Sequence, residues 1–223
     1  MWAIALLCLV RGTAAAIPIV IDTDMSIDVD DVGMLCAAHA LQDLDEAKIL
    51  AVVHDCGADA GVGAVSVINR FYGRDDIPIG AYRGPLGNSS GFFPGEVGWT
   101  QRGRGVYIDD LVAAFPSTVR RAADVPEATV VFRQALAEAA DRSVTIVSVG
   151  FATNLLSLLQ SPADGFSGLA GVELVRAKVS RLVFMGGRQN LKAGEPVEWN
   201  FGGWHLPRQH PAGGGDSLTS LAP

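Results

Sequence analysis

The sequence lacks any concentration of basic residues. Its 223 residues include 17 Lys and Arg against 24 Asp and Glu, which gives a formal net charge of −7. Proteins that bind nucleic acids need clustered Lys and Arg to contact the phosphate backbone, and the basic residues here are scattered along the chain. The composition therefore argues against a nucleic-acid partner and favours a small neutral substrate.

The sequence also lacks internal repeats and any linker-like segment that would divide it. Its hydrophobic content of 49% and its positive mean hydropathy exclude a disordered protein. A chain of this length can bury a sizeable core as a single unit. We therefore expect one globular domain at residues 17–204, followed by an irregular tail rich in Pro and Gly at residues 205–223.

The N-terminal segment, residues 1–16, is apolar but too short to span a bilayer as a helix. An apolar run at residues 3–10 precedes small residues at 14–16, a pattern typical of a secretory signal peptide cut before Ile17. This predicts a secreted or ER-lumenal protein without membrane contact after cleavage. Because no Lys or Arg precedes the run, an uncleaved anchor or a misassigned start codon, and hence a cytoplasmic protein, stays open.

Cysteine is scarce, with three residues in the chain. Cys36 and Cys56 would remain after cleavage of the signal peptide. In an oxidising lumen these two could form a disulfide, but two separate buried thiols fit the sequence equally well.

Runs of apolar, β-branched residues alternate with segments of helical periodicity. This alternation predicts an α/β fold with a mostly parallel sheet flanked by helices. The expected strands are residues 17–21, 48–54, 77–81, 143–149 and 181–185, and the expected helices are 30–41, 61–72, one begun by 124–127, one from 155, and 168–178. We expect Asp124 to cap the helix after it, with Glu127 three residues on. Residues 83–105 predict a long loop.

Five aspartates follow the first expected strand within ten residues, namely Asp22, Asp24, Asp28, Asp30 and Asp31. Carboxylates this close repel one another, because each charge raises the cost of ionising the next. A hard divalent cation is the simplest remedy. The cluster stands where a strand passes into a helix, which is the edge at which open α/β sheets bind ligands. The pattern therefore predicts a metal site.

Other interpretations account for less of this cluster. A solvated acidic loop would not be bracketed so tightly by apolar residues. An EF-hand fails because neither register supplies both the loop glycine and the final glutamate. A phosphatase of the haloacid dehalogenase class, with Asp22 as the nucleophile of a strand-terminal Asp-x-Asp, is the better rival. It leaves the last three aspartates unexplained.

Three segments resemble the inosine-uridine preferring nucleoside hydrolases. The sequence DTDMSIDVDD at residues 22–31 is similar to the family's N-terminal signature, in the variant with two extra residues before the closing Asp-Asp. Residues 147–155 are similar to the family's central strand-loop-helix, and residues 182–187 followed by 198–201 are similar to its ribose-binding stretch. Because the three occur in the family's order, they imply a Rossmann-like nucleoside hydrolase fold, incomplete at the C-terminus.

The resemblance implies an enzyme that hydrolyses the N-glycosidic bond of ribonucleosides to ribose and free base with a calcium-bound water. The implied cofactor is Ca²⁺, and the implied partner is a small nucleoside. The metal ligands carried over from the motifs are Asp24, which is also the general base, Asp31 and the main-chain carbonyl of Val149. The residues carried over as ribose-binding are Asp30, Met185, Glu198 and Asn200. Asp22 would help to position the residues that bind the ion.

The sequence departs from the family pattern in two places. Family members carry a C-terminal His-Asp pair whose aspartate is another calcium ligand, and the residues after Trp204 contain no such pair. The family also tends to have an asparagine after its second strand, where this chain has Asp55. A riboside-binding remnant with impaired turnover therefore stays open beside the enzyme. Base preference, assembly into a homo-oligomer and the role of Asp28 are undecided.

Overall fold

A computed structural model describes residues 15–26, 28–84, 107–186 and 200 of the chain. The strands are β1 (Ile17–Thr23), β2 (Ala47–His54), β3 (Ile79–Ala81), β4 (Val144–Ser148) and β5 (Val179–Phe184). The helices are α1 (Asp30–Asp43), α2 (Asp59–Phe71), α3 (Tyr107–Ala114), α4 (Ala128–Glu138), α5 (Thr153–Gln160) and α6 (Gly171–Lys178), with a 3-10 helix, η2, at Ala122–Asp124.

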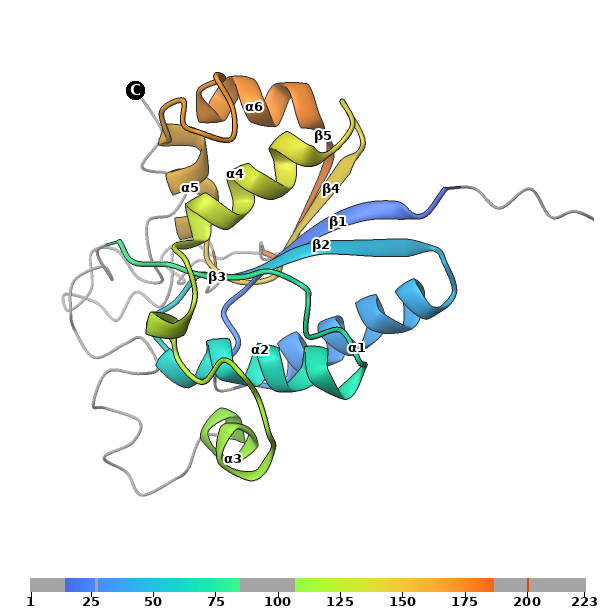
Figure 1. The fold of residues 1–223 in the computed structure, drawn as a ribbon, viewed down its shortest axis with the longest axis vertical. Helices are drawn as coiled ribbons and strands as arrows, with labels where there is room; N and C mark the ends of the chain where they lie inside the picture. Colours follow the sequence, from blue (N-terminus) through green and yellow to red (C-terminus); the bar gives the residue numbers. More distant parts are fainter. Residues whose placement is uncertain (1–14, 27, 85–106, 187–199, 201–223) are drawn as a thin grey trace, which may run out of the picture.

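The strands form one five-stranded sheet in the order β3-β2-β1-β4-β5, and every neighbouring pair is parallel. Figure 1 shows the sheet between two layers of helices, with α4, α5 and α6 on one face and α1, α2 and α3 on the other. The predicted α/β fold with a parallel sheet flanked by helices is confirmed.

Each face of the sheet has its own apolar core, because successive side chains of a strand point to opposite faces. In β1, Ile19 and Ile21 pack with residues of α1 and α2, such as Leu35. Val20, between them, packs with residues of α4 to α6, such as Phe132. A strand buried on both faces reads as a continuous apolar run, which is why β1 was visible in the sequence.

The order of the strands creates a switch point beside β1. The chain moves outward from β1 to β2 and β3, and it then returns to place β4 and β5 on the opposite side of β1. The connection after β1 and the connection after β4 therefore run to opposite sides of the sheet. This creates a crevice at the carboxyl ends of the strands, where open α/β sheets bind ligands. Asp22 of β1 lies in register with Ser148 of β4 at this edge.

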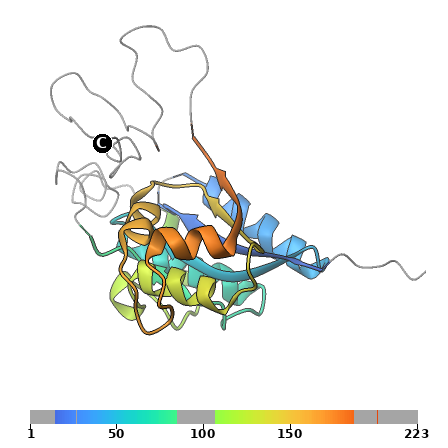
Figure 2. The same cartoon turned by 90° about the horizontal axis from the view of Figure 1, so that it is seen from above.

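The strand β5 forms one edge of the described sheet, as Figure 2 shows. Its side chains are more exposed than those of the central strands, and Leu182 and Val183 are 50% and 47% exposed. Among the described residues, the helices α4 to α6 cover this strand from one side only. On the β2 side of the switch point the strand side chains are therefore more buried than on the β5 side.

The helix α4 begins later than the sequence predicts. It starts at Ala128, after Glu127, and Asp124 does not cap it. The carboxylate of Asp124 instead accepts hydrogen bonds from the backbone nitrogens of Arg120 and Arg121. Pro126 is extended toward β3, where its carbonyl accepts a hydrogen bond from the Ala81 nitrogen at 3.0 Å. Pairing with a distant strand thus overrides the local capping pattern.

Other boundaries differ by smaller amounts. The helix α3, Tyr107–Ala114, follows the segment expected as a long loop and was not predicted. The helix α5 begins at Thr153 rather than at residue 155. The helix α6 begins at Gly171 rather than at residue 168, and it leads directly into β5.

A buried arginine in α4 fixes the segment between α5 and α6. Arg133 is 2% exposed, and its Nε donates to Asp164 Oδ2 at 2.6 Å. The same guanidinium donates to Ser161 Oγ at 2.8 Å and to the carbonyl of Leu169 at 2.9 Å. All three guanidinium nitrogens of Arg133 therefore have hydrogen-bond partners, so the ion pair with Asp164 has a structural role.

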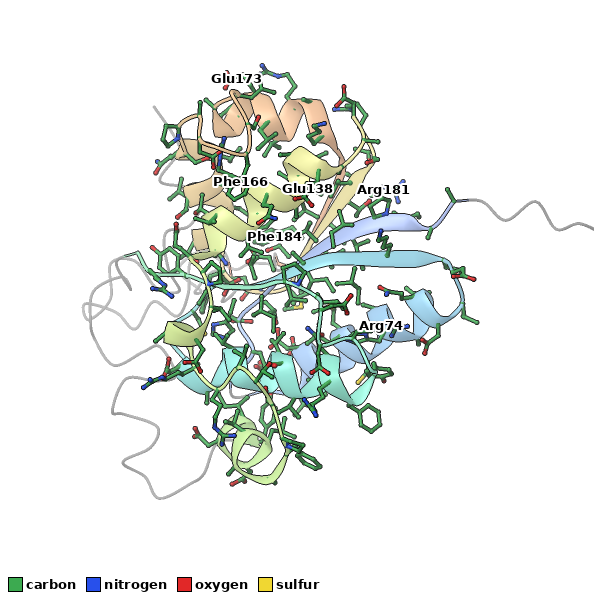
Figure 3. All side chains as sticks on the ribbon, viewed as in Figure 1. Arg74, Glu138, Phe166, Glu173, Arg181 and Phe184 are labelled. Carbon is green, nitrogen blue, oxygen red and sulfur yellow. The ribbon has the colours of Figure 1, made fainter. Side chains whose placement is uncertain are left out.

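The histidine of α1 is also a structural group. His39 is fully buried, donates from Nε2 to Asn69 Oδ1 at 2.9 Å and stacks on Tyr72. Arg74, labelled in Figure 3, donates to its Nδ1 at 3.1 Å and pairs with Asp43. Burial lowers the pKa of His39, so the ring is neutral near pH 7.

The two described cysteines are free thiols, so the structure has the unpaired arrangement. Among the described helices, none combines the length and the hydropathy that crossing a membrane requires. The predicted signal peptide at residues 1–16 lies almost wholly outside the described residues, as does most of the predicted loop at 83–105. The predicted tail at 205–223 lies outside them as well.

Candidate metal and ribose site

The carboxyl ends of β1, β2 and β4 bring polar side chains together at the switch point. Asp22, the second-last residue of β1, is buried. Its carboxylate accepts hydrogen bonds from Ser148 Oγ at 3.1 Å and from Asn154 Nδ2 at 2.9 Å. Burial raises the pKa of Asp22 to about 7, and these two hydrogen bonds oppose the shift. Asp22 therefore ties β1 to β4 and α5, which suits the supporting role expected for it.

Asp31, in the first turn of α1, turns inward toward the sheet. Its side chain is 1% exposed, and Thr23 Oγ1 donates to its Oδ1. Its Oδ2 is buried and has no hydrogen-bond partner among the described residues. Burial raises the pKa of Asp31 to about 7, and the nearby charges of Asp30 and Asp28 add to this effect. One oxygen of Asp31 is thus fixed and the other is available to a ligand.

Asp24 lies directly after β1, between the strand and the acidic segment that leads to α1. Its side chain is partly buried. Burial raises the pKa of Asp24, and the charges of Asp31 and Asp28 raise it further. A carboxylate with a raised pKa is a better proton acceptor than a free aspartate once it is ionised.

The three remaining positions of the acidic segment lie close together. Asp28, Asp30 and Asp31 each offer a carboxylate oxygen within 4.8 Å of the other two. Asp28 and Asp30 are exposed, whereas Asp31 is buried. The structure thus brings the predicted ligand Asp31 and the predicted ribose contact Asp30 together with Asp28, whose role the sequence left undecided.

The predicted residues of the second and third motifs meet on the other side of the crevice. Asn200 is 4% exposed, and its Nδ2 donates to the carbonyl of Val149 at 3.1 Å and to that of Met185 at 3.0 Å. The Val149 nitrogen donates to Asp22 O at 2.9 Å, which holds this backbone beside β1. A carbonyl oxygen has two lone pairs, so that of Val149 can accept from Asn200 and still face a cation. Glu198 lies outside the described residues.

Two residues near these carboxylates were not singled out as site candidates by the sequence reasoning. Asp55 follows β2 and is fully buried at the same edge of the sheet. Tyr107, the first residue of α3, has a buried hydroxyl without a hydrogen-bond partner among the described residues. Burial raises the pKa of Tyr107, and Asp31 is the largest of the charges that add to the shift. A polar residue after an apolar strand was the available signal for Asp55; Tyr107 had none.

His54 and Cys56 flank Asp55 and have structural roles. His54 is buried, and its Nε2 donates to the carbonyl of Met25 at 3.1 Å. Burial lowers the pKa of His54 to about 4, so the ring is neutral at pH 7. The Cys56 thiol is 3.6 Å from the Asp24 carbonyl, and burial raises its pKa. Neither group supplies a positive charge to the aspartates near pH 7.

The donor set fits a hard divalent cation. The described side chains that converge here are carboxylates, and several of their oxygens, namely Asp31 Oδ2 and both oxygens of Asp55, are buried without a hydrogen-bond partner. Calcium takes oxygen ligands from carboxylates and main-chain carbonyls, whereas zinc prefers nitrogen and sulfur. A cation would also offset the burial and the mutual repulsion that raise the pKa values of these aspartates.

Comparisons with known proteins agree with this geometry. The family model for inosine-uridine preferring nucleoside hydrolases matches residues 19–203. The chain therefore belongs to the inosine-uridine preferring nucleoside hydrolase family. A search among curated proteins gave no match.

Solved structures share the fold at low sequence identity. The effector protein XOO4466 is 19% identical with a TM-score of 0.58, and the match covers 79% of this chain and 45% of that one. The type III effector protein XopQ, complexed with adenosine diphosphate ribose, is 19% identical with a TM-score of 0.57, with coverages of 80% and 45%. A plant nucleoside hydrolase, PpNRh1, is 22% identical with a TM-score of 0.46, with coverages of 77% and 48%. The chain thus spans less than half the length of these structures.

Proposed function

We propose that this protein hydrolyses the N-glycosidic bond of ribonucleosides, releasing ribose and free base, with Ca²⁺ as cofactor. The observation that carries the proposal is the group of buried, incompletely paired carboxylates at the switch point of a chain that the family model matches over residues 19–203. A solvated acidic loop would leave such oxygens in water instead. The activity and its ion are inferences from this arrangement and from the family.

The residues that would hold the cation are Asp24, Asp31 and the main-chain carbonyl of Val149. When bound, a divalent cation supplies Lewis-acid polarisation and orients the reacting groups. Asp31 suits this role, because Thr23 donates a hydrogen bond to one carboxylate oxygen and the other has no partner among the described residues. Asn200 and the Asp22 carbonyl fix the backbone of Val149 from two sides.

Asp24 would accept the proton of the attacking water as general base. Water adds to the anomeric carbon as the bond to the base breaks, and the ribose becomes oxocarbenium-like. Carboxylates that are already fixed stabilise this positive charge better than they stabilise the neutral substrate. Asp30, Met185, Glu198 and Asn200 would bind the sugar and keep it aligned, which lowers the entropic cost of the reaction.

A riboside-binding protein with impaired turnover is the second candidate. XopQ, a structure that shares the fold of this chain, was solved in complex with adenosine diphosphate ribose. Such a protein would keep the sugar contacts of the site and lack groups that assist departure of the base. It would bind ribosides without releasing free ribose.

A phosphatase with Asp22 as nucleophile fits the structure poorly. Asp22 is fully buried, and its two oxygens accept hydrogen bonds from Asn154 and Ser148. A nucleophilic carboxylate needs access to its substrate and a free lone pair. The position of Asp22 suits a supporting residue instead.

Release of ribose from inosine and uridine tests the proposal. The protein is assayed with Ca²⁺ and after chelation with EGTA. We expect ribose release with calcium, loss of activity in EGTA and recovery when calcium is restored. Asp24→Ala should abolish turnover, whereas Asp45→Asn, an exposed control, should leave it unchanged.

The outcomes separate the candidates. No ribose from any common nucleoside, together with riboside binding in calorimetry, would support the binding protein and contradict the hydrolase. Phosphate release that depends on Asp22 would support the phosphatase. Secretion is proposed from residues 1–16 and is tested separately by N-terminal sequencing of the mature protein, which should begin at Ile17.

A further inference from the structure

Asp55 is the most enclosed carboxylate at the switch point, and the proposed function does not use it. Its side chain is fully buried at the carboxyl end of β2. Its backbone is fixed from two directions, because its nitrogen donates to Thr23 O at 3.0 Å and its carbonyl accepts from Thr153 Oγ1 at 2.7 Å. The position of Asp55 is therefore set by β1 and α5 together.

The carboxylate of Asp55 has no cationic partner among the described residues. Burial raises its pKa, and the backbone N–H of Phe151 opposes this shift only in part. Both oxygens are buried without a hydrogen bond of ordinary geometry, and no Lys, Arg or His among the described residues forms an ion pair with it. The nearest charges, those of Asp22, Asp24 and Asp31, have the same sign. A buried carboxylate in such surroundings is costly unless a cation joins it.

The side chain of Asp55 points into the crevice between β1 and β4. A Cβ placed on Gly150 would lie 2.4 Å from Asp55 Oδ2 and 2.6 Å from the backbone nitrogen of Asp24. The carboxylate therefore packs against the bare backbone that follows β4, beside the loop that follows β1. Glycine at position 150 leaves the room that this carboxylate occupies.

We propose that Asp55 is a further carboxylate of the divalent-cation site and supplies negative charge to it alongside Asp24 and Asp31. The proposal rests on the proposed function only for the existence of that cation site. The number of charged ligands tunes calcium affinity. Removal of this charge should therefore weaken calcium binding, whether the carboxylate contacts the ion or orients a group that does.

Asp55→Asn tests the proposal, because it removes the charge and keeps the shape. The matched control is Asp45→Asn, which makes the same change at an exposed residue whose positive φ of 58° asparagine tolerates. Calcium affinity is measured by titration calorimetry on metal-free protein. Melting temperature is measured in EGTA and in millimolar calcium.

We expect Asp55→Asn to weaken calcium binding by at least about tenfold and to shrink the calcium-induced rise in melting temperature. The melting temperature in EGTA should not fall, because asparagine keeps the shape of the side chain and places no charge at this buried position. Asp45→Asn should match the wild type in all three measurements. Asp55→Ser, a smaller neutral side chain, should weaken calcium binding in the same way and covers the case in which the amide is not accommodated.

Calcium affinity in Asp55→Asn equal to that of the wild type would overturn the proposal, and so would a wild type that binds no calcium at millimolar concentration. A lower melting temperature in EGTA with an unchanged calcium-induced rise would assign Asp55 a purely structural role. Ribose release is measured in parallel. If calcium binding depends on Asp55 but no ribose is released, the hydrolase proposal alone is contradicted. If ribose release depends on calcium but Asp55→Asn binds calcium as the wild type does, only the role of Asp55 is contradicted.

Discussion

Two buried charged regions of this protein are built in opposite ways. The guanidinium of Arg133 has an ion-pair partner in Asp164 and further acceptors in Ser161 and Leu169. The carboxylates of Asp31 and Asp55 lie among other carboxylates, with buried oxygens that have no partner. The first region pairs its charge within the described residues, whereas the second has no cationic side chain among them.

The pKa values of the carboxylates follow this difference. The hydrogen bond from Arg133 lowers the pKa of Asp164 to about 2. Burial raises the pKa of Asp22 and that of Asp31 to about 7. Evolution toward stability alone would favour the first arrangement, so the second is more typical of a functional site.

Arg133→Met should have the largest effect on stability. It keeps most of the apolar stem but leaves Asp164 and the surrounding acceptors without their donor, which we expect to cost about 3 kcal/mol of unfolding free energy. Denaturant unfolding measures the loss. Arg70→Met is the control, because its ion pair with Asp75 is exposed on both sides and should contribute at most about 1 kcal/mol. Equal losses of unfolding free energy in Arg133→Met and Arg70→Met would contradict this contrast between a buried and an exposed ion pair.

Gly150→Ala should disturb the second region. The new Cβ would collide with the Asp55 carboxylate and the Asp24 backbone, and such overpacking typically costs about 1–3 kcal/mol. We also expect weaker calcium binding in calorimetry, because both aspartates must move. Gly33→Ala makes the same change on the exposed side of α1 with no atom within 4 Å of the new Cβ. It should stabilise the protein by about 0.5–1 kcal/mol, and a similar gain in Gly150→Ala would refute the close contact.

The acidic region should also produce a distinct pH dependence in the metal-free protein. The folded protein keeps the proton of Asp22 up to about pH 7, whereas the unfolded chain releases it near the ordinary pKa of 3.8. Stability that depends on Asp22 is therefore complete below about pH 4 and is lost as the pH rises toward 7. Unfolding in EGTA should show wild type losing on the order of 2 kcal/mol relative to Asp22→Asn between about pH 4.5 and pH 7.5.

Calcium provides the control for this pH dependence. A bound cation favours the ionised aspartates, so saturating calcium should reduce the loss. A difference between wild type and Asp22→Asn that is constant across the pH range would show that Asp22 does not hold a proton in the folded state.

Tyr107→Phe should have the smallest effect. The hydroxyl of Tyr107 is buried without a hydrogen-bond partner among the described residues, so its removal breaks no bond that stabilises the fold. We expect the unfolding free energy of the metal-free protein to change by at most about 0.5 kcal/mol. A loss well above this value would mean that the hydroxyl has a stabilising partner.

Much of the fold and part of the site were readable from the sequence. The strand β1 was visible because both of its faces are buried and its residues are continuously apolar. The acidic segment was visible because its five aspartates lie within ten residues of the sequence. Val149, Met185 and Asn200 came from the family resemblance, and the structure brings them together through the hydrogen bonds of Asn200.

The start of α4 and the closeness of Asp55 to Asp24 were not readable in the same way. Asp124 and Glu127 form a good local capping pattern, but pairing of Pro126 with Ala81 of β3 extends the chain there. Asp55 is separated from Asp24 by an entire helix and strand, and only parallel pairing of β1 with β2 places the two at one edge. Such long-range pairings carry no signal in a local sequence pattern.

The sequence by itself determined the alternation of strands and helices and the acidic segment after β1, because both are written in the spacing of neighbouring side chains. Only the tertiary structure decided which aspartates are buried and which oxygens are left without a partner. Burial and pairing depend on the surroundings that distant segments build, here β2, β4 and α5 around the end of β1.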